Sequence, residues 1–277
     1  MSPSHLDLDL DLAQNVESIE RATVAAVAPD AVTEIPGWLL PFDGGTVGRA
    51  HSAVPLRHDA SILAADVAAI VIRYRERGLA PSLRVADVPA LAHLAPALAA
   101  AGLVRTQPTL TCVARVADIL SRFGPHGGDA GGGGGAASVA VLPAPDAAWS
   151  QVYLGEGFDP VDGAHRVRAL SRAAGSLYAC SSANGAGHVA SGVVATGVGS
   201  LGHGLLGIHG MRTLPGHRRQ GHASRILRAL AQRAQARGVA GAYLQVEEGN
   251  APALRLYASL GFSVAWRYIY WRAGAKQ

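Results

Sequence analysis

The sequence predicts an α/β fold with a mixed sheet, arranged as two tandem domains, and two observations support this prediction. A glycine-rich run at residues 127–137 cannot pack a core, and it divides the 277-residue chain into parts of similar size. After this run, antiparallel strands and then strand, helix, strand, helix and strand are predicted, which is typical of a mixed sheet with helices on its faces. The first part ends in a similar order. We therefore predict related domains at 1–125 and 138–277, joined by a linker at 126–137.

The first part begins with a loose lead-in at residues 6–12, where Leu and Asp alternate. Apolar residues at helical spacing then predict a helix at 13–28. Strands are predicted at 32–42 and 49–54, because β-forming residues flank the turn residues at 43–45.

A long helix is predicted at residues 60–77, with Asp59 as its cap and Gly78 as its end. Its apolar residues recur at helical spacing, so one face is expected to be buried. The remaining elements predicted in this part are a strand at 82–85, a helix at 89–100 and a strand at 104–115.

The second part has clearer periodicity. The helix predicted at residues 222–237 buries Ile226, Leu227 and Leu230 and ends at Gly238. The other predicted elements are helices within 147–174, strands at 176–181, 188–196, 205–214 and 242–246, a helix at 251–260 and a strand at 262–271.

The composition is that of an ordinary globular protein, with 49% hydrophobic and 16% charged residues. No apolar run reaches the ~18–20 residues of a membrane-spanning helix, and the acidic start does not have the pattern of a signal peptide. The two cysteines lie far apart and have no metal-ligand spacing. We therefore expect a cytoplasmic protein with no membrane partner and no metal.

Positive charge is concentrated in the second part. The formal net charge is only +4, yet no acidic residue occurs between Asp162 and Glu247. Arginines that fall within this acid-free stretch are Arg166, Arg168, Arg172, Arg212, Arg218, Arg219, Arg225, Arg228, Arg233 and Arg237. An anionic ligand is expected, because guanidinium groups suit phosphate. A nucleic-acid partner is not expected, since neither interleaved aromatic residues nor a DNA-reading motif accompanies the arginines.

One candidate binding segment joins the strand ending at residue 214 to the helix starting at 222. The free amides of such a loop and the positive end of the helix dipole suit a pyrophosphate. Gly221 would let the phosphate approach the backbone, and Arg218 and Arg219 would add charge. Alternatively, the segment is only the basic, solvated start of a helix.

A second motif follows, and the two together resemble the signatures of the GNAT superfamily of N-acetyltransferases. The first signature, R-x-x-G-x-A, is matched by Arg218, Gly221 and Ala223. The second, L-x-V-x-x-x-N-x-x-A-x-x-L-Y-x-x-x-G-F, is matched at every fixed position by Leu244, Val246, Asn250, Ala253, Leu256, Tyr257, Gly261 and Phe262. The resemblance covers residues 137–272. The first part resembles the degenerate N-terminal domain of tandem GNAT proteins, which implies that it does not bind coenzyme A.

This resemblance implies an acetyl-CoA slot between two splayed parallel strands. The pantetheine arm would pair with the backbone of Met211, Arg212 and Thr213, and an amide near Met211 would polarise the thioester carbonyl. The pyrophosphate would bind the loop residues of the first signature. These residues are Arg218, Arg219, Gln220, Gly221, His222, Ala223 and Ser224.

Catalytic roles are less directly indicated. Asn250 is either a helix N-cap or a cofactor contact, and we expect both. Tyr257 is either a core aromatic residue or, by resemblance, the acid that protonates the departing thiolate. His209 is the candidate general base, since strand alternation places Gly207, His209, Met211 and Thr213 on one face, and the alternative is a histidine that merely bonds within the strand. Glu247 and Glu248 are further candidates for the base.

The predicted function is transfer of an acetyl group from acetyl-CoA to an amine by direct attack, without a covalent enzyme intermediate. The acceptor is a small-molecule amine or a protein amine, and the sequence does not distinguish these. It also leaves a homodimer open. The alternative function is a non-catalytic acyl-CoA-binding sensor or regulatory module.

Overall fold

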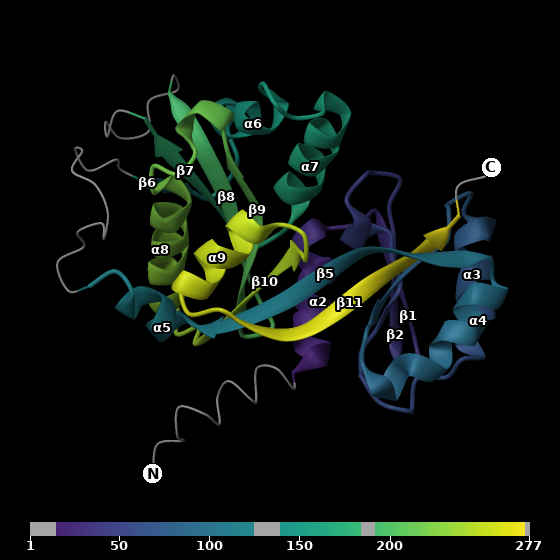
Figure 1. Cartoon of the computed structure of the whole chain (residues 1–277). Helices are drawn as coiled ribbons and strands as arrows, with labels where there is room; N and C mark the ends of the chain where they lie inside the picture. The colour runs from purple at the N-terminus through teal and green to yellow at the C-terminus, as the bar shows by residue number, and fades with distance from the viewer. Residues whose placement is uncertain (1–14, 125–138, 184–191, 275–277) are drawn as a thin grey trace, which may run out of the picture.

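The computed structural model describes residues 15–124, 139–183 and 192–274. Within these ranges the chain forms an eight-stranded sheet with the strand order β4-β11-β5-β10-β9-β8-β7-β6 and a three-stranded sheet with the order β1-β2-β3 (Figure 1). The predicted α/β fold with a mixed sheet is thus confirmed. The predicted lead-in at 6–12 and the linker at 126–137 lie outside the described residues.

The strands are β1 Ala31–Ile35, β2 Trp38–Phe42, β3 Val54–Pro55, β4 Ser82–Ala86, β5 Leu103–Arg115, β6 Val139–Leu142, β7 Ser176–Ser182, β8 Val193–Gly202, β9 Leu205–Thr213, β10 Gly241–Glu247 and β11 Ser263–Ala273. The α-helices are α2 Val16–Val27, α3 Asp66–Glu76, α4 Ala95–Ala100, α5 Val116–Ser121, α6 Ala147–Leu154, α7 Pro160–Arg172, α8 His222–Gln235 and α9 Ala251–Ser259. Short 3₁₀ helices are η1 Gly48–Ala50, η2 Pro89–Leu94 and η3 Pro215–His217. None of the helices in the described ranges is long and apolar enough to cross a bilayer.

Strand β11 joins the two parts of the chain. It lies between β4 and β5, antiparallel to both, although these two strands precede the glycine-rich run. Figure 1 shows β5 and β11 crossing the molecule side by side. Aromatic residues of β11, such as Tyr268 and Trp271, pack in one core with Trp38 and Tyr74 of the first part. The division into two domains at the glycine-rich run stays a prediction, and the sheet itself is continuous across it.

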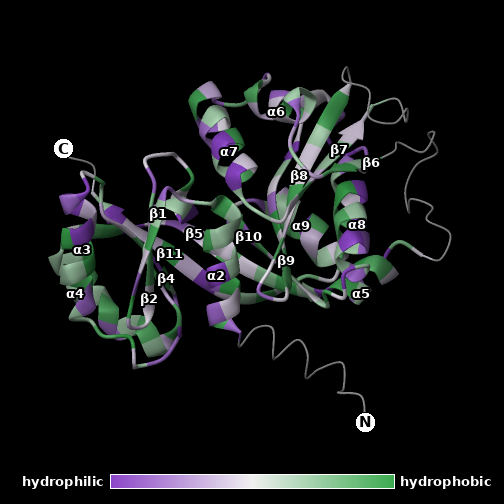
Figure 2. Cartoon of the chain, turned by 180° about the vertical axis from the view of Figure 1, so that it is seen from behind, coloured by the Kyte–Doolittle hydropathy of each residue, from purple (hydrophilic) through white to green (hydrophobic). Residues whose placement is uncertain are grey.

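Helices cover both faces of the sheet in the second part. Helix α8 packs its apolar stripe of Ile226, Leu227 and Leu230 against one face. Trp149 and Tyr153 of α6 pack against the other face with residues of α7, β7 and β8. Hydrophilic and hydrophobic residues alternate along α8 in Figure 2, as expected for a helix with one buried side.

Parallel strands β9 and β10 separate after a short paired segment. They are in register only from Leu205↔Gly241 to Ile208↔Leu244. Beyond this point β10 continues to pair with β5 as far as Glu247, and β9 continues to pair with β8. The edges of β9 and β10 that face each other therefore have no ladder partner among the described strands.

A β-bulge in β9 accompanies this separation. Thr196 pairs with Arg212 and Val198 pairs with His209, so Gly210 and Met211 lie opposite the single residue between Thr196 and Val198. Gly210 has φ +56, a conformation that L side chains rarely adopt, and a Cβ there would collide with the Tyr153 hydroxyl. The expected alternation of Gly207, His209, Met211 and Thr213 on one face is therefore wrong, because the bulge interrupts it after His209.

Several boundaries in the first part differ from prediction. The strand predicted at 32–42 is instead the hairpin β1-β2, which turns at Gly37 with φ +79. The helix predicted at 60–77 begins only at Asp66, because Asp59 caps a local turn in which its carboxylate accepts from the Ser61 amide at 2.8 Å. The strand predicted at 49–54 is mostly replaced by η1 and a loop, followed by β3.

The observed boundaries in the second part differ less from the predicted ones. Strand β8 lies later than the strand predicted at 188–196, of which residues 188–191 are outside the described ranges. Sequence periodicity missed β6 here and α5 at the end of the first part, which are four and six residues long. Segments this short contain too few residues to establish a period.

Candidate functional site

The loop between β9 and α8 has the conformation that an anion site needs. Gly221 is the N-cap of α8 with φ +78, and Arg219 also has a positive φ of 62. Within the described part of the chain, no side chain accepts a hydrogen bond from the first amides of α8. These amides carry the positive end of the helix dipole, so an anionic ligand there would be stabilised.

A cavity of about 1100 Å³ opens beside this loop. All seven loop residues expected to bind the pyrophosphate line it, namely Arg218, Arg219, Gln220, Gly221, His222, Ala223 and Ser224. The described residues provide no carboxylate within ion-pair distance of Arg218 or Arg219, and Arg218 donates only to the Thr213 carbonyl, at 3.4 Å. The structure therefore brings the predicted residues together, with their charge available to a ligand.

His222 differs from its neighbours in this loop. Its side chain is 3% exposed, and its Nδ1 hydrogen-bonds with the Ser181 hydroxyl at 2.8 Å. Burial lowers the pKa of the imidazole, and the charge of Arg225 lowers it further. His222 can thus offer a ligand its backbone amide, while its side chain fixes the helix against β7.

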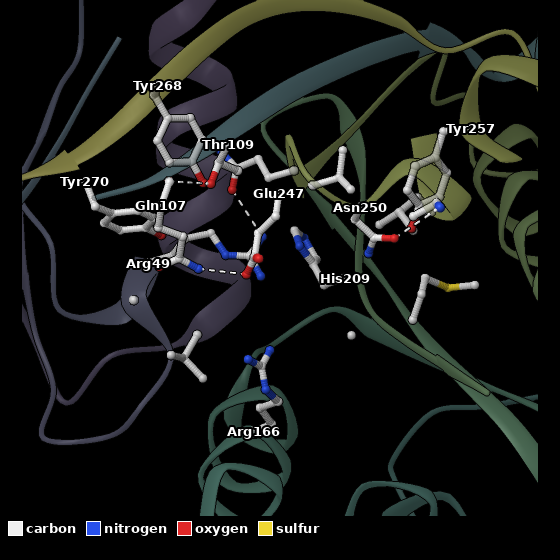
Figure 3. A pocket seen from close by; sticks show the side chains of 18 residues that line it. Arg49, Gln107, Thr109, Arg166, His209, Glu247, Asn250, Tyr257, Tyr268 and Tyr270 are labelled. Atoms are coloured by element: carbon white, nitrogen blue, oxygen red, sulfur yellow. Dashed lines mark hydrogen bonds between the residues drawn. The ribbon is translucent and has the colours of Figure 1, made fainter. Parts of the chain in front are cut away.

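A second, smaller cavity of about 280 Å³ lies where β9 and β10 separate. Its walls include residues of β9, β10 and α9, together with η1, β5, α7 and β11 (Figure 3). Four residues line both cavities, namely Met211, Asn250, Ala253 and Tyr257. The two cavities therefore adjoin at these residues, and two ligands bound in them would meet there.

Of the three β9 residues expected to pair with pantetheine, Met211 lies at the junction, and Arg212 and Thr213 line only the larger cavity. The guanidinium of Arg212 stacks on Phe158 at 3.8 Å and bonds Asp162 at 3.2 Å. These contacts engage the side chain of Arg212. Its backbone lies on the separated part of β9.

Asn250 is confirmed as the cap of α9, since its side-chain oxygen accepts from the Ala253 amide at 3.2 Å. Its contact with a cofactor stays a prediction. Tyr257 is 9% exposed and packs edge-on against Phe262, with ring centroids 5.9 Å apart. Burial raises the pKa of Tyr257 to about 12, and nearby Cys112 contributes in the same direction. The phenol therefore remains protonated at neutral pH, as a proton donor must.

His209 is less suited to the role of general base than its position suggests. It lines the smaller cavity, but its side chain is only 2% exposed and its Nε2 bonds the Ser200 hydroxyl at 2.9 Å. Burial lowers the pKa of this imidazole well below 6.5, and the charge of Arg49 lowers it further. The pKa shift makes His209 a weak base, and its catalytic role stays a prediction.

Glu247 and Glu248 have different surroundings. Glu247 lines the smaller cavity, where Gln107 donates to its carboxylate at 2.8 Å. Glu248 instead forms an ion pair with Arg267 at 3.0 Å. Of the two glutamates, Glu247 is therefore the one positioned to receive a proton from a ligand in the cavity.

Sequence reasoning missed the wall that the first part and strand β11 contribute. Arg49, Gln107 and Thr109 line the smaller cavity, as do Tyr268 and Tyr270 on β11 (Figure 3). The motifs lie after residue 214, and no local pattern marks residues that reach the cavity from elsewhere. Only the sheet order, with β11 and β5 beside β10, brings them there.

The separated strands, the bulge in β9 and the open start of α8 together define the GNAT fold. Solved structures support this class. A GCN5-related N-acetyltransferase from Kribbella flavida has 16% identity over 94% of this chain and 96% of that chain, with a TM-score of 0.66. A tandem GNAT protein from the clavulanic acid biosynthesis pathway has 13% identity over 94% and 96% of the two chains, with a TM-score of 0.57.

A functionally unknown conserved protein from Staphylococcus epidermidis is also similar, with 10% identity over 89% of this chain and 94% of that chain and a TM-score of 0.60. The family model described as "Probable histone acetyltransferase Rv0428c C-terminal" matches residues 13–271, and the chain belongs to this family. None of the curated proteins gives a significant match. The resemblance to tandem GNAT proteins is thus confirmed, and identities this low establish the fold alone.

Proposed function

We propose that the protein transfers an acetyl group from acetyl-CoA to an amine by direct attack. The separation of β9 from β10 beside the open start of α8 is the observation that carries this proposal. The amides from Arg219 to Ser224 and the guanidinium of Arg218 fit a pyrophosphate. The unpaired edge of β9 near Met211 fits a chain of amides such as pantetheine, since its own backbone groups need partners.

Acetyl-CoA supplies a reactive thioester carbonyl and a thiolate leaving group. Tyr257 lies at the junction of the two cavities and keeps its proton at neutral pH, so it is suited to protonate a thiolate. Glu247 faces the smaller cavity and is suited to accept the proton that an ammonium must lose before it attacks. The adjoining cavities favour transfer within one ternary complex, because each substrate has its own space.

The alternative is a sensor that binds acyl-CoA without turnover. One observation favours it: His209, the histidine in the smaller cavity, is held neutral and bonded to Ser200, so it cannot act as an efficient base. Calorimetric titration with acetyl-CoA, combined with detection of free thiol in the presence of an amine panel, separates the two functions. Binding with thiol release on any amine supports the transferase, and binding with release on none supports the sensor.

Two classes of amine are candidate acceptors. The family description names histones, which suggests a lysine side chain in a basic protein. The other class is a small-molecule amine. A basic protein and a small acidic amine would interact oppositely with the charges around the smaller cavity.

A further inference from the structure

The smaller cavity holds more positive than negative charge. Its charged lining residues are Arg49, Arg166 and Glu247. Figure 3 shows the Arg166 side chain extending from its helix toward the cavity, with Arg49 and Glu247 on other walls. These three charges, and the way each is compensated, indicate what the cavity accepts.

Arg49 is a half-buried guanidinium that forms no ion pair in the ranges that the structure describes. Its Nη1 donates to the side-chain oxygen of Gln245 at 3.1 Å, which is a neutral acceptor. Other half-buried arginines, such as Arg21, Arg115, Arg212 and Arg267, do form ion pairs. The buried Glu20 acts on Arg49 only at longer range, because its carboxylate pairs with Arg84. A partly desolvated cation without a close counter-charge is costly unless a ligand supplies one.

Arg166 shares its counter-charge. Its Nε donates to Asp162 at 2.7 Å, and the same carboxylate also accepts from Arg212 at 3.2 Å and from the Thr46 hydroxyl at 2.8 Å. One carboxylate therefore serves two guanidinium groups. No described residue accepts a hydrogen bond from the terminal nitrogens of Arg166, which leaves them free to bind an anion.

Glu247 provides the opposite charge in this cavity. Its carboxylate bonds only the neutral Gln107 amide, and no cationic side chain of the described chain lies within 4 Å. Its backbone carbonyl accepts from the amide of Asn250 at 2.9 Å, and Asn250 lines both cavities. The cavity thus presents one carboxylate and two guanidinium groups on its walls.

We propose that the acceptor is a small amine that also carries a carboxylate, such as a free α-amino acid. This inference rests on the proposed function. Arg49 and Arg166 bind the carboxylate, and Glu247 binds the ammonium group and takes its proton. The amine nitrogen then attacks the thioester carbon, the new C–N bond forms as the C–S bond breaks, and Tyr257 protonates the thiolate. The cavity of about 280 Å³ suits a molecule of this size, and its net positive charge repels a lysine within a basic peptide.

The test compares matched acceptors. Thiol release from acetyl-CoA is measured with free α-amino acids, with the primary amide of each, and with a lysine-containing basic peptide. We expect kcat/KM to be about 10- to 100-fold higher for the best acid than for its amide, because charge-assisted bonds to a carboxylate are lost in the amide. Arg49→Gln and Arg166→Gln should each reduce this ratio toward one while leaving the calorimetric affinity for acetyl-CoA unchanged. Arg49→Lys should keep part of the preference.

Arg233→Gln is the matched control, since it removes the same charge from an exposed position of α8 outside both cavities. It should leave the acid-to-amide ratio unchanged. An equal rate with acids and amides, or a higher kcat/KM with the basic peptide, overturns the inference.

A binding measurement keeps the inference testable if no amine is acetylated. The N-acetyl derivatives of the same amino acids are then titrated calorimetrically into the protein saturated with coenzyme A. Binding that Arg49→Gln weakens at least tenfold supports the carboxylate site even if the transferase proposal fails. Binding that is absent, or equal in the variant, overturns it.

Discussion

Gly221→Glu should abolish the affinity for acetyl-CoA. Gly221 has φ +78 at the start of α8, so a side chain there costs about 1–2 kcal/mol of backbone strain. The new carboxylate would also compete for the amides that a pyrophosphate needs. At about 5 Å from one phosphate charge, with an effective dielectric constant of about 20, the repulsion is about 3 kcal/mol, which is more than a 100-fold loss of affinity. Calorimetric titration of both proteins with acetyl-CoA measures this loss.

Gly238→Glu is the control for strain and charge. Gly238 follows the other end of α8, has φ +72, and would have no atom within 4 Å of an added Cβ. This variant carries the same backbone cost and the same charge, but it leaves the loop intact. It should bind acetyl-CoA like the parent protein. If Gly221→Glu binds as tightly as the parent, or if Gly238→Glu weakens binding equally, the assignment of the phosphate site is refuted.

Three further predictions concern catalysis, capping and pH. Tyr257→Phe keeps the ring that packs against Phe262 but loses the proton donor. We therefore expect kcat to fall by about 100-fold or more, with little change in the Kd for acetyl-CoA. A loss of affinity with unchanged kcat would contradict the acid role. Asn250→Ala removes the cap of α9 and should lower the free energy of unfolding, measured in urea, by about 1 kcal/mol. Asn250→Asp keeps a capping oxygen and should retain most of the parent's stability. Equal stabilities of the parent and Asn250→Ala would exclude the cap as a stabilising contact. Burial lowers the pKa of His58 to about 4, so between pH 6.5 and 4 the unfolded chain binds a proton that the folded chain does not, and stability falls as the pH falls. His58→Gln should remove about 1–2 kcal/mol of the stability lost between pH 7 and pH 5, measured by urea unfolding at both values, and an unchanged loss would show that His58 does not contribute.

Local patterns predicted the second part of the chain well because its signals are local. Helix α8 has an apolar stripe that repeats at helical spacing. Each of the two motifs includes the turn where a strand passes into a helix, at the start of α8 and of α9. Loop residues 218–224 are contiguous in sequence, so the cavity wall they form could be inferred without knowing the fold. The cap at Asn250 was likewise predictable from the residue type and its place before a helix.

The remainder depends on contacts between distant segments. Nothing in residues 263–273 indicates that this strand pairs with β4 and β5, because both the predicted and the observed element are simply a strand. Arg49 reaches the smaller cavity only because the first part packs beside β10. The bulge at Gly210 was missed because strand alternation assumes an unbroken ladder. The Tyr153 hydroxyl of α6 lies so close to Gly210 that a side chain would not fit at this position.

The position of β11 affects the folding of the chain during synthesis and the ways in which its gene can be divided. During synthesis on a ribosome, β4 and β5 remain without the strand between them until residues 263–273 have emerged. The fragment before the glycine-rich run would expose one edge of β4, both edges of β5 and an uncovered aromatic core, which favours aggregation. Gene fusion or fission at that run therefore cannot yield two self-sufficient modules, and either half would need its counterpart supplied in trans to complete the sheet.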